Sequence, residues 1–359
     1  MKSFYLDCHY RILRSSMPLI SIYGTVFNNG YVIEESIRSL ARVLPNFSER
    51  YELVIVDNYS TDGTWEKLLR LKREFKNLRL FRSKCSRGRG RDLALKQTIG
   101  DYVMYVDLDT IFEPGFGTIV ERLYTLCRPR EMWNFGFSTR ETMIEHIGGW
   151  KDLNSGEDWE MTARAIANGI EVKTILTYHF MRNVRTSKAG SGEMRYSKGR
   201  IRYLLRRLRN LNDMVRAHKF TPAYILKGEA KISPSIILAL MFSGSYTLPK
   251  ALKDKTIEPA DIIVHRQRKY LLPEEVGLPK DWLFTWWAQA TLFWPLLKEV
   301  VLRVVKKTGN CIIAFLTGDG SLAIFRDQRI FMRWFNNMKT LAIRIKSDPS
   351  KIRLLHYLR

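Results

Sequence analysis

The feature that most constrains the fold is an alternation of short apolar segments and helix-forming segments through the first half of the chain. Four apolar, β-branched or aromatic runs are expected strands, at residues 19–26, 53–56, 78–81 and 102–106. Between them, apolar residues recur at helical spacing, as at Ile33, Ile37 and Leu40. This alternation predicts an α/β fold with a mostly parallel, Rossmann-like sheet flanked by helices. Its ligand site should lie at the carboxyl ends of the strands.

Polar and acidic residues stand at the ends of these predicted strands. Thr25 is close to the end of the first strand, Asp57 follows the second, and Asp107 and Asp109 follow the fourth. Two carboxylates at a sheet edge suit Mg²⁺ or Mn²⁺ bridging a diphosphate. Taken alone, an Asp-x-Asp triplet is more often a solvated turn between a strand and a loop.

The basic charge of the chain is concentrated in its second half. The net charge is +23; residues 1–185 carry 27 Lys and Arg against 23 Asp and Glu, and the remainder carries 32 against 13. The nearly balanced first half argues against nucleic acid as its ligand, whereas the second half should attract an anionic partner. The four cysteines form no C-x-x-C pair, and the first ten residues show no secretory signal. Both observations favour a reducing, cytoplasmic setting without structural zinc.

Six short segments follow one another in a characteristic order along residues 19–180. They are Gly24–Asn28, Val54–Thr64, Gly88–Ala94, Gly100–Asp109, Ile147–Trp150 and Gly156–Trp159. Each is weak by itself, but in this order and spacing they resemble the family 2 glycosyltransferases, which are inverting enzymes with the GT-A nucleotide-sugar-binding fold. The sequence departs from the family pattern at Asn58, where members often have a second aspartate, so the preference for base and sugar stays open.

The resemblance implies a nucleotide-sugar donor and residues that bind it. Asp57 would accept a hydrogen bond from an N–H of the nucleotide base, and Thr25 and Phe27 would lie against the same base. Asp109 would be the principal ligand of Mn²⁺ or Mg²⁺, and Asp107 would reach the sugar or ribose hydroxyls. The metal would offset the charge on the departing nucleoside diphosphate.

Three further donor-side roles have competing explanations. Asp62 either contacts the donor or caps the helix that follows it. At least one residue of a basic run is expected to face the diphosphate, because arginine pairs bidentately with phosphate oxygens, and the rest would form a solvated helix face. Arg89 and Arg91 are the candidates in that run, which consists of Arg82, Lys84, Arg87, Arg89 and Arg91. His179 either completes the metal site, as a late histidine does in some GT-A enzymes, or is structural.

The acceptor side of the resemblance rests on residues 147–158. Asp158 would be the general base that takes the proton from the acceptor hydroxyl, opposite the leaving diphosphate, which yields inversion in one displacement. Its alternative role is an acid at a helix amino terminus. Glu157 would support Asp158 or contact acceptor hydroxyls, and Gly149 and Trp150 are assigned to the acceptor side.

The second half is expected to be a basic, mainly helical region. Residues 186–199 read as a flexible loop that closes over the donor, and residues 201–211 as a basic amphipathic helix. The segment Trp282–Leu297 is too short to span a bilayer but holds four tryptophans, which favour the headgroup interface. Residues 330–345 form an apolar helical stripe with basic flanks. The region either lies on an anionic membrane or caps the catalytic domain.

The predicted organisation is therefore an extension at 1–17, a GT-A catalytic domain at 18–185, a loop at 186–199 and a basic region at 200–359. The predicted function is sugar transfer to a glycan or lipid-linked acceptor hydroxyl at the cytoplasmic face of a membrane. One alternative is a polyprenyl-phosphate glycosyltransferase. Others are a non-catalytic sugar-nucleotide binder and a basic nucleic-acid-binding protein on an α/β scaffold. Nucleic acid is disfavoured because the basic segments carry aliphatic stripes instead of exposed aromatic rings on strands.

Overall fold

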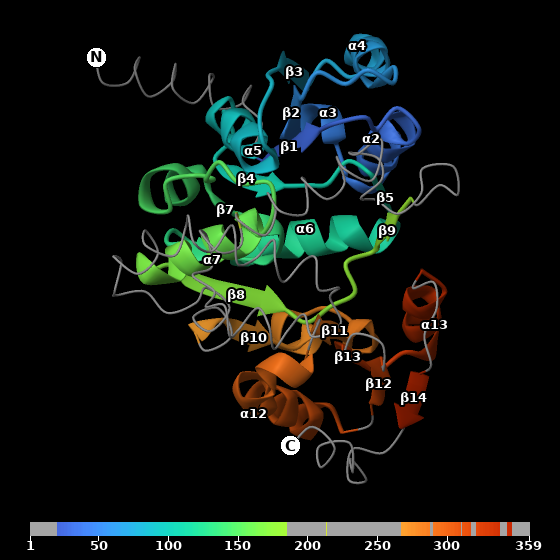
Figure 1. Cartoon of the computed structure of the whole chain (residues 1–359). Coiled ribbons are helices and arrows are strands. Elements are labelled where there is room, and N and C mark those ends of the chain that lie inside the picture. The colour runs from blue at the N-terminus through green and yellow to red at the C-terminus, as the bar shows by residue number, and fades with distance from the viewer. Residues whose placement is uncertain are drawn as a thin grey trace, which may run out of the picture. The chain divides into compact units, whose positions relative to one another are not determined.

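A computed structural model describes residues 20–184, 213, 267–287, 290–309, 311–316, 321–337 and 343–346 (Figure 1). Backbone contacts divide the chain into two compact units. The described residues of the first unit are 20–157, 167–170 and 180–184, and those of the second are 158–166, 171–179 and 213 onwards. The predicted extension at 1–17, the loop at 186–199 and the amphipathic helix at 201–211 lie outside the described residues.

The first unit is built on a five-stranded sheet in the order β3-β2-β1-β4-β7 (Figure 1). Strands β1 to β4 run parallel, and β7 runs antiparallel to β4. Their bounds are Ile20–Val26 for β1, Tyr51–Asp57 for β2, Leu78–Arg82 for β3, Tyr102–Tyr105 for β4 and Ser138–Thr139 for β7. All seven residues of β2 are buried, as is typical of an inner strand in a sheet covered by helices. The four predicted strands and the α/β class are therefore confirmed.

Helices connect these strands, and their inward faces carry the residues that the sequence pattern predicted. The helices are α2 (Ile33–Val43), α3 (Phe47–Arg50), α4 (Thr64–Glu74), α5 (Arg87–Lys96) and α6 (Pro114–Leu126). In α2, Ile33, Ile37 and Leu40 are fully buried, since the helical period turns them all toward the sheet. Helix α5 begins after Ser86, whose hydroxyl accepts a hydrogen bond from the backbone N–H of Arg89 and caps the helix.

Shorter elements complete the first unit. Strand β5 (Thr110–Phe112) pairs antiparallel with β9 (Met181–Asn183). Strand β6 (Glu131–Met132), a short 3₁₀ turn at Asn134–Gly136 and a π-helical turn at Thr142–His146 lie between α6 and the second unit's first helix along the chain.

The register of the sheet brings the ends of its inner strands to one edge. Val26 of β1 pairs with Asp57 of β2, and Asp57 pairs with Arg82 of β3. On the other side of β1, Tyr23 pairs with Tyr105, and the N–H of Val106 donates to the Tyr23 carbonyl over 3.0 Å. The segments that follow β1, β2 and β4 therefore leave the sheet at the edge that was predicted to bind ligand.

The second unit combines helices with two small sheets. Helix α7 (Glu157–Ala167) belongs to it apart from its end residues, and β8 (Glu171–Ile175) pairs parallel with β10 (Lys269–Leu271). An antiparallel sheet has the order β11-β13-β12-β14. Its strands are Phe284–Trp287, Ser321–Phe325, Ile312–Leu316 and Ile343–Lys346 in that order. Helices α12 (Ala290–Thr308) and α13 (Gln328–Asn337) and 3₁₀ turns at Pro273–Val276 and Lys280–Trp282 complete the described part.

The antiparallel sheet corrects the sequence analysis at two places. The apolar segment Trp282–Leu297 divides into β11 and the start of α12. On β11, Trp287 is buried and Trp286 is 44% exposed, because neighbouring strand residues face opposite sides. The stripe predicted as one helix over residues 330–345 is wrong in its second part, since α13 ends at Asn337 and Ile345 lies in β14, paired with β12. Within the described ranges, no helix has both the length and the apolar character needed to cross a bilayer.

Candidate active site

The site is organised around Arg91, which α5 places against the end of β4. Its side chain is almost fully buried. Nη2 donates to Oδ1 of Asp107 over 2.7 Å, and Nη1 donates to Oε1 of Glu157 over 3.0 Å. The guanidinium carbon lies 4.7 Å from the ring centre of Tyr105 and 4.8 Å from that of Trp150. Arg91 thus joins the end of β4, the turn at Trp150 and the start of α7, and both cation–π contacts hold its plane in place.

The two carboxylates on Arg91 differ in exposure. The Asp107 side chain is 64% exposed, whereas that of Glu157 is only 3% exposed. Desolvation alone would raise the pKa of Asp107, but the positive charges of Arg91 and Arg87 hold that pKa below its usual range. Asp107 therefore stays ionised and faces solvent at the sheet edge. Glu157 also accepts a hydrogen bond of 3.4 Å from Arg87, so its charge is balanced by two guanidinium groups.

The turn at Gly149 and Trp150 supports Arg91 from the other side. The indole N–H of Trp150 donates to the Tyr23 hydroxyl over 2.9 Å, and its backbone N–H donates to Oδ1 of Asp92 over 3.3 Å. Gly149 has φ +66°, and a Cβ there would lie 2.4 Å from that Asp92 oxygen, so the turn requires glycine. These two residues were predicted to bind acceptor. In the structure both are buried, and the Trp150 ring packs against the Arg91 guanidinium.

The arginines of α5 separate into one buried and two exposed side chains. Arg89 and Arg87 are each 48% exposed, and Arg89 pairs with Asp92 over 3.1 Å. The prediction that most of this basic run forms a solvated face agrees with that exposure. A contact of Arg89 or Arg91 with a diphosphate stays a prediction.

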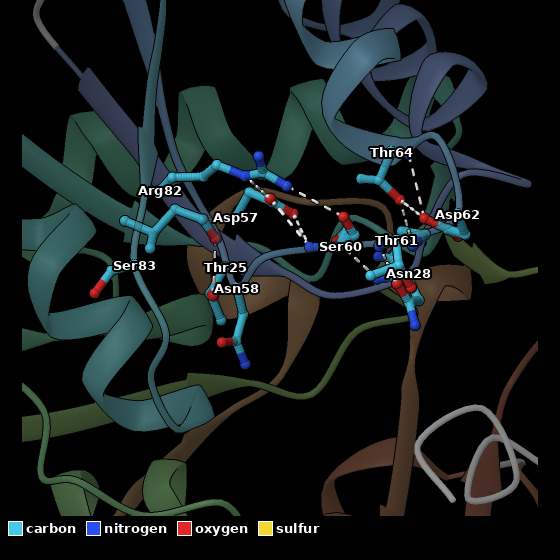
Figure 2. Close-up of polar contacts among 12 residues, drawn as sticks. Thr25, Asn28, Asp57, Asn58, Ser60, Thr61, Asp62, Thr64, Arg82 and Ser83 are labelled. Atoms are coloured by element: carbon cyan, nitrogen blue, oxygen red, sulfur yellow. Dashed lines mark hydrogen bonds and ion pairs between the residues drawn. The ribbon is translucent and has the colours of Figure 1, made fainter. Parts of the chain in front are cut away.

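Two loops at the ends of β1 and β2 are joined by hydrogen bonds (Figure 2). The N–H of Asn28 donates to the Ser60 hydroxyl over 2.9 Å, and the N–H of Thr61 donates to Oδ1 of Asn28 over 3.0 Å. Asp62 accepts from the N–H of Gly30 over 2.8 Å and from the N–H of Thr64 over 3.2 Å. Asp62 therefore links both loops to the start of α4, one residue before the N-cap position that Gly63 occupies.

Asp57 lies at the centre of this edge and is fully buried (Figure 2). Its Oδ2 accepts a hydrogen bond from Nε of Arg82 over 2.8 Å, and its carboxylate also accepts from the N–H of Ser60. The Thr25 hydroxyl donates to the Val56 carbonyl over 2.9 Å, and Phe27 follows β1 as a half-buried side chain. The three residues that were predicted to bind the base thus gather at one edge.

Asn58 explains one departure from the family pattern. Its side-chain nitrogen donates to the Cys85 carbonyl over 2.7 Å, and its oxygen accepts from the Cys85 N–H over 2.9 Å. A carboxylate has no donor for the first of these bonds. Asparagine is therefore the residue that satisfies both backbone groups of Cys85.

The two residues predicted to bind metal lie in different units. Asp109 is half-buried in the first unit, and His179 belongs to the second, as does the predicted general base Asp158. Desolvation lowers the pKa of His179 to about 4, so its ring is neutral at pH 7. Asp158 stands at the start of α7 and accepts a hydrogen bond from the N–H of Trp159 over 2.9 Å. In the part of the chain that the structure describes, no three His, Cys, Asp or Glu residues form a group able to hold a metal ion.

Sequence reasoning gave no role of their own to Arg82, Tyr23 and Tyr105, and it named Arg82 only within the basic run. Arg82 is the last residue of β3 and lies at the same edge as Asp57, so the rule that named the other strand ends could have named it. In the sequence, Arg82 is not distinguished from the other basic residues that follow it. Tyr23 and Tyr105 read only as apolar strand residues, and their contacts depend on the register between β1 and β4.

Comparison with known proteins agrees with the class that this fold and edge define. Residues 21–125 match the family model described as Glycosyl transferase family 2, and this segment covers less than a third of the chain. Residues 21–125, which include the parallel strands β1 to β4, thus form a segment of the family 2 glycosyltransferase type. No curated protein sequence matches the chain.

Several solved structures show a loose similarity. TarS of S. aureus in complex with UDP-GlcNAc is 16% identical, over 66% of this chain and 76% of that chain, with a TM-score of 0.41. The mannosyltransferase PcManGT from Pyrobaculum calidifontis, in complex with GDP-Man and Mn²⁺, is 17% identical over 69% and 80%, with a TM-score of 0.42. Glucosyl-3-phosphoglycerate synthase from Mycobacterium tuberculosis is 17% identical over 53% and 80%, with a TM-score of 0.37. Similarity at this level assigns no ligand to this chain.

Proposed function

We propose that this glycosyltransferase transfers a sugar from a UDP- or GDP-sugar to an acceptor hydroxyl by a single inverting displacement. The observation that carries the proposal is the convergence on Arg91. This one buried side chain contacts Asp107, the first Asp of the Asp-x-Asp segment, the ring of Trp150, and Glu157, the first residue of α7. Such an arrangement is expected where charged groups must be held in fixed positions for a reaction.

On the donor side, Asp109 is the proposed principal ligand for Mn²⁺ or Mg²⁺. These ions take hard oxygen donors and often bind through one or two carboxylates, with water and phosphate filling the other positions, so the described acids fit this chemistry. When bound, the ion would supply charge stabilisation for the departing diphosphate. Asp107 is ionised and exposed in the structure, and the exposed guanidinium groups of Arg87 and Arg89 suit phosphate oxygens. Asp107 would also reach the sugar or ribose hydroxyls, and His179 is the proposed further ligand.

On the acceptor side, Asp158 is the proposed general base. Glu157, the residue before it in the sequence, is fixed by its ion pair with Arg91. The Asp158 carboxylate is a group that can accept the proton of a glycan or lipid-linked hydroxyl. A polyprenyl phosphate is already an anion and would need this base less.

We propose a peripheral location on the cytoplasmic face of an anionic membrane. Support comes from the basic second half and from Trp286, Leu302 and Met332, large apolar side chains that are 41–44% exposed in the second unit. At about 1 kcal/mol for each Lys or Arg near such a surface, six engaged residues are enough for reversible attachment. Flotation of the full chain with vesicles containing phosphatidylserine, at low and high salt, tests this location.

The donor site is tested by thermal stabilisation, because a ligand that binds only the native state must raise its stability. UDP or GDP with Mn²⁺ should raise the melting temperature of the full chain, and Asp109→Ala should remove the metal-dependent part. Asp101→Ala is the matched control, since Asp101 lies on the exposed amino end of the same strand region. No stabilisation by either nucleotide at millimolar concentration would refute the donor site.

Turnover then tests the chemistry. Asp158→Asn should abolish sugar transfer to a hydroxyl acceptor while nucleotide binding persists. Retention of transfer to a polyprenyl phosphate in Asp158→Asn would favour that alternative acceptor. Salt-sensitive RNA binding without any response to nucleotide sugars would instead favour a nucleic-acid-binding protein.

A further inference from the structure

Arg82 holds a fixed position at the edge where the donor base is expected. Its guanidinium carbon lies 4.9 Å from the ring centre of Tyr59 and 4.8 Å from that of Trp65. Its Nε donates to Asp57 over 2.8 Å, and its Nη2 donates to the Ser60 carbonyl over 3.1 Å (Figure 2). Two aromatic contacts and two hydrogen bonds therefore define the plane of the guanidinium.

Arg82 is partly exposed to solvent, whereas the Asp57 carboxylate with which it pairs is not. Asp57 is fully buried, whereas the Arg82 side chain is 31% exposed and Tyr59 is 52% exposed. Of these three side chains, Arg82 and Tyr59 are accessible to a base and Asp57 is not. A hydrogen bond from the base to Oδ2 of Asp57 would compete with the Nε donor of Arg82.

The chemistry of Arg82 fixes which base edge it can recognise. A guanidinium has five N–H donors and no acceptor. Its contacts with Asp57 and Ser60 involve Nε and Nη2, and no described residue accepts a hydrogen bond from Nη1. Its complement is a base edge with acceptors, such as O4 of uracil or O6 and N7 of guanine. The exocyclic amino group of cytosine or adenine would place a donor against a donor.

We infer that Arg82, positioned by Asp57, Tyr59 and Trp65, reads the donor base and selects nucleotides with an exocyclic carbonyl over those with an exocyclic amino group. The inference rests on the proposed function, because it assumes a nucleoside diphosphate at this edge. It differs from the direct contact of Asp57 with the base that the family resemblance implies. In this assignment Asp57 is a positioning residue.

The first test measures the binding of UDP, GDP, CDP and ADP to the full chain by titration calorimetry with Mn²⁺ present. UDP or GDP should bind about tenfold to hundredfold more tightly than CDP and ADP, because O4 of uracil or O6 of guanine accepts from Arg82 where an exocyclic amino group cannot. Arg82→Gln should reduce that preference to less than about threefold. Arg79→Gln is the control, since Arg79 lies on the same strand in an ion pair with Glu52 and should leave the preference unchanged.

The second test changes the ligand instead of the protein, so it does not depend on how a variant folds. N3-methyl-UDP lacks the N–H group from which Asp57 would accept a hydrogen bond, but it keeps O4. If Arg82 reads the base, N3-methyl-UDP should bind within about threefold of UDP. The corresponding probe for a chain that prefers GDP is N1-methyl-GDP, which keeps O6 and N7.

The outcomes separate this inference from the proposed function. Tenfold or greater loss with the methylated nucleotide, or an unchanged preference in Arg82→Gln, would overturn the assignment to Arg82 and leave the donor site standing. Equal binding of all four nucleotides would overturn it too. Absence of binding by all four nucleotides would refute the donor site and this inference together.

Discussion

Replacing Arg91 by methionine should both destabilise the first unit and stop activity. The change keeps a long side chain between Tyr105 and Trp150 but removes the charge that balances Glu157, which is only 3% exposed. Removing one partner of a buried ion pair costs about 3–5 kcal/mol when the remaining charge is left without compensation. Arg87, which is 48% exposed and lies 3.4 Å from Glu157, keeps part of that compensation, so the cost should fall toward the lower end of this range. The second ion pair adds about 1 kcal/mol at most, since the Asp107 side chain is 64% exposed.

That loss corresponds to a fall in melting temperature of roughly 6–20 °C for a unit of this size. Urea unfolding followed by tryptophan fluorescence, together with scanning calorimetry, measures both quantities. Arg38→Met is the matched control, because Arg38 pairs with Glu74 at the surface, where both side chains are more than 40% exposed. It should cost about 1 kcal/mol or less.

A second substitution separates charge from packing. In Arg91→Met with Glu157→Leu, the uncompensated carboxylate is gone, and more than half of the lost stability should return, since apolar residues of similar size often replace a buried ion pair without loss. Activity should not return, because Asp107 has still lost its 2.7 Å contact. A cost below about 1 kcal/mol for Arg91→Met, or a double variant no more stable than the single one, would refute the reasoning.

Three further results are expected. Tyr23→Phe removes the acceptor of the Trp150 indole N–H and should cost about 1–3 kcal/mol in urea unfolding, since that buried donor is left unsatisfied. Burial raises the pKa of Tyr23 above its usual value near 10. The contribution of the neutral Tyr23 hydroxyl to stability is therefore present below pH 10 and is lost as the pH rises further. Wild type should lose stability above pH 10 more steeply than Tyr23→Phe. Asn58→Asp sets a carboxylate against the Cys85 carbonyl and should cost about 1–3 kcal/mol, with Asn58→Ala as the comparison that lacks the repulsion.

The local parts of the first unit were predictable because their signals are short in range. Buried strands such as β2 are continuous apolar runs, and α2 shows its buried face through residues three and four apart. The rule that ligands bind at the carboxyl ends of parallel strands then predicts that Thr25, Asp57 and Asp107 lie at one edge. In the second unit the same signals failed for residues 343–346, because pairing with β12 overrides a helical pattern there.

By itself, the sequence determined the α/β class, the inner strands and the edge that holds the site, since hydrophobic period and strand ends are local properties. Only the tertiary structure decided the roles within that edge. There, Asp57 is buried and paired with Arg82, and the Trp150 ring packs against Arg91. The physical reason is that burial, ion pairing and ring stacking depend on distances between segments tens of residues apart in the sequence, which the register of the sheet sets and no local pattern records.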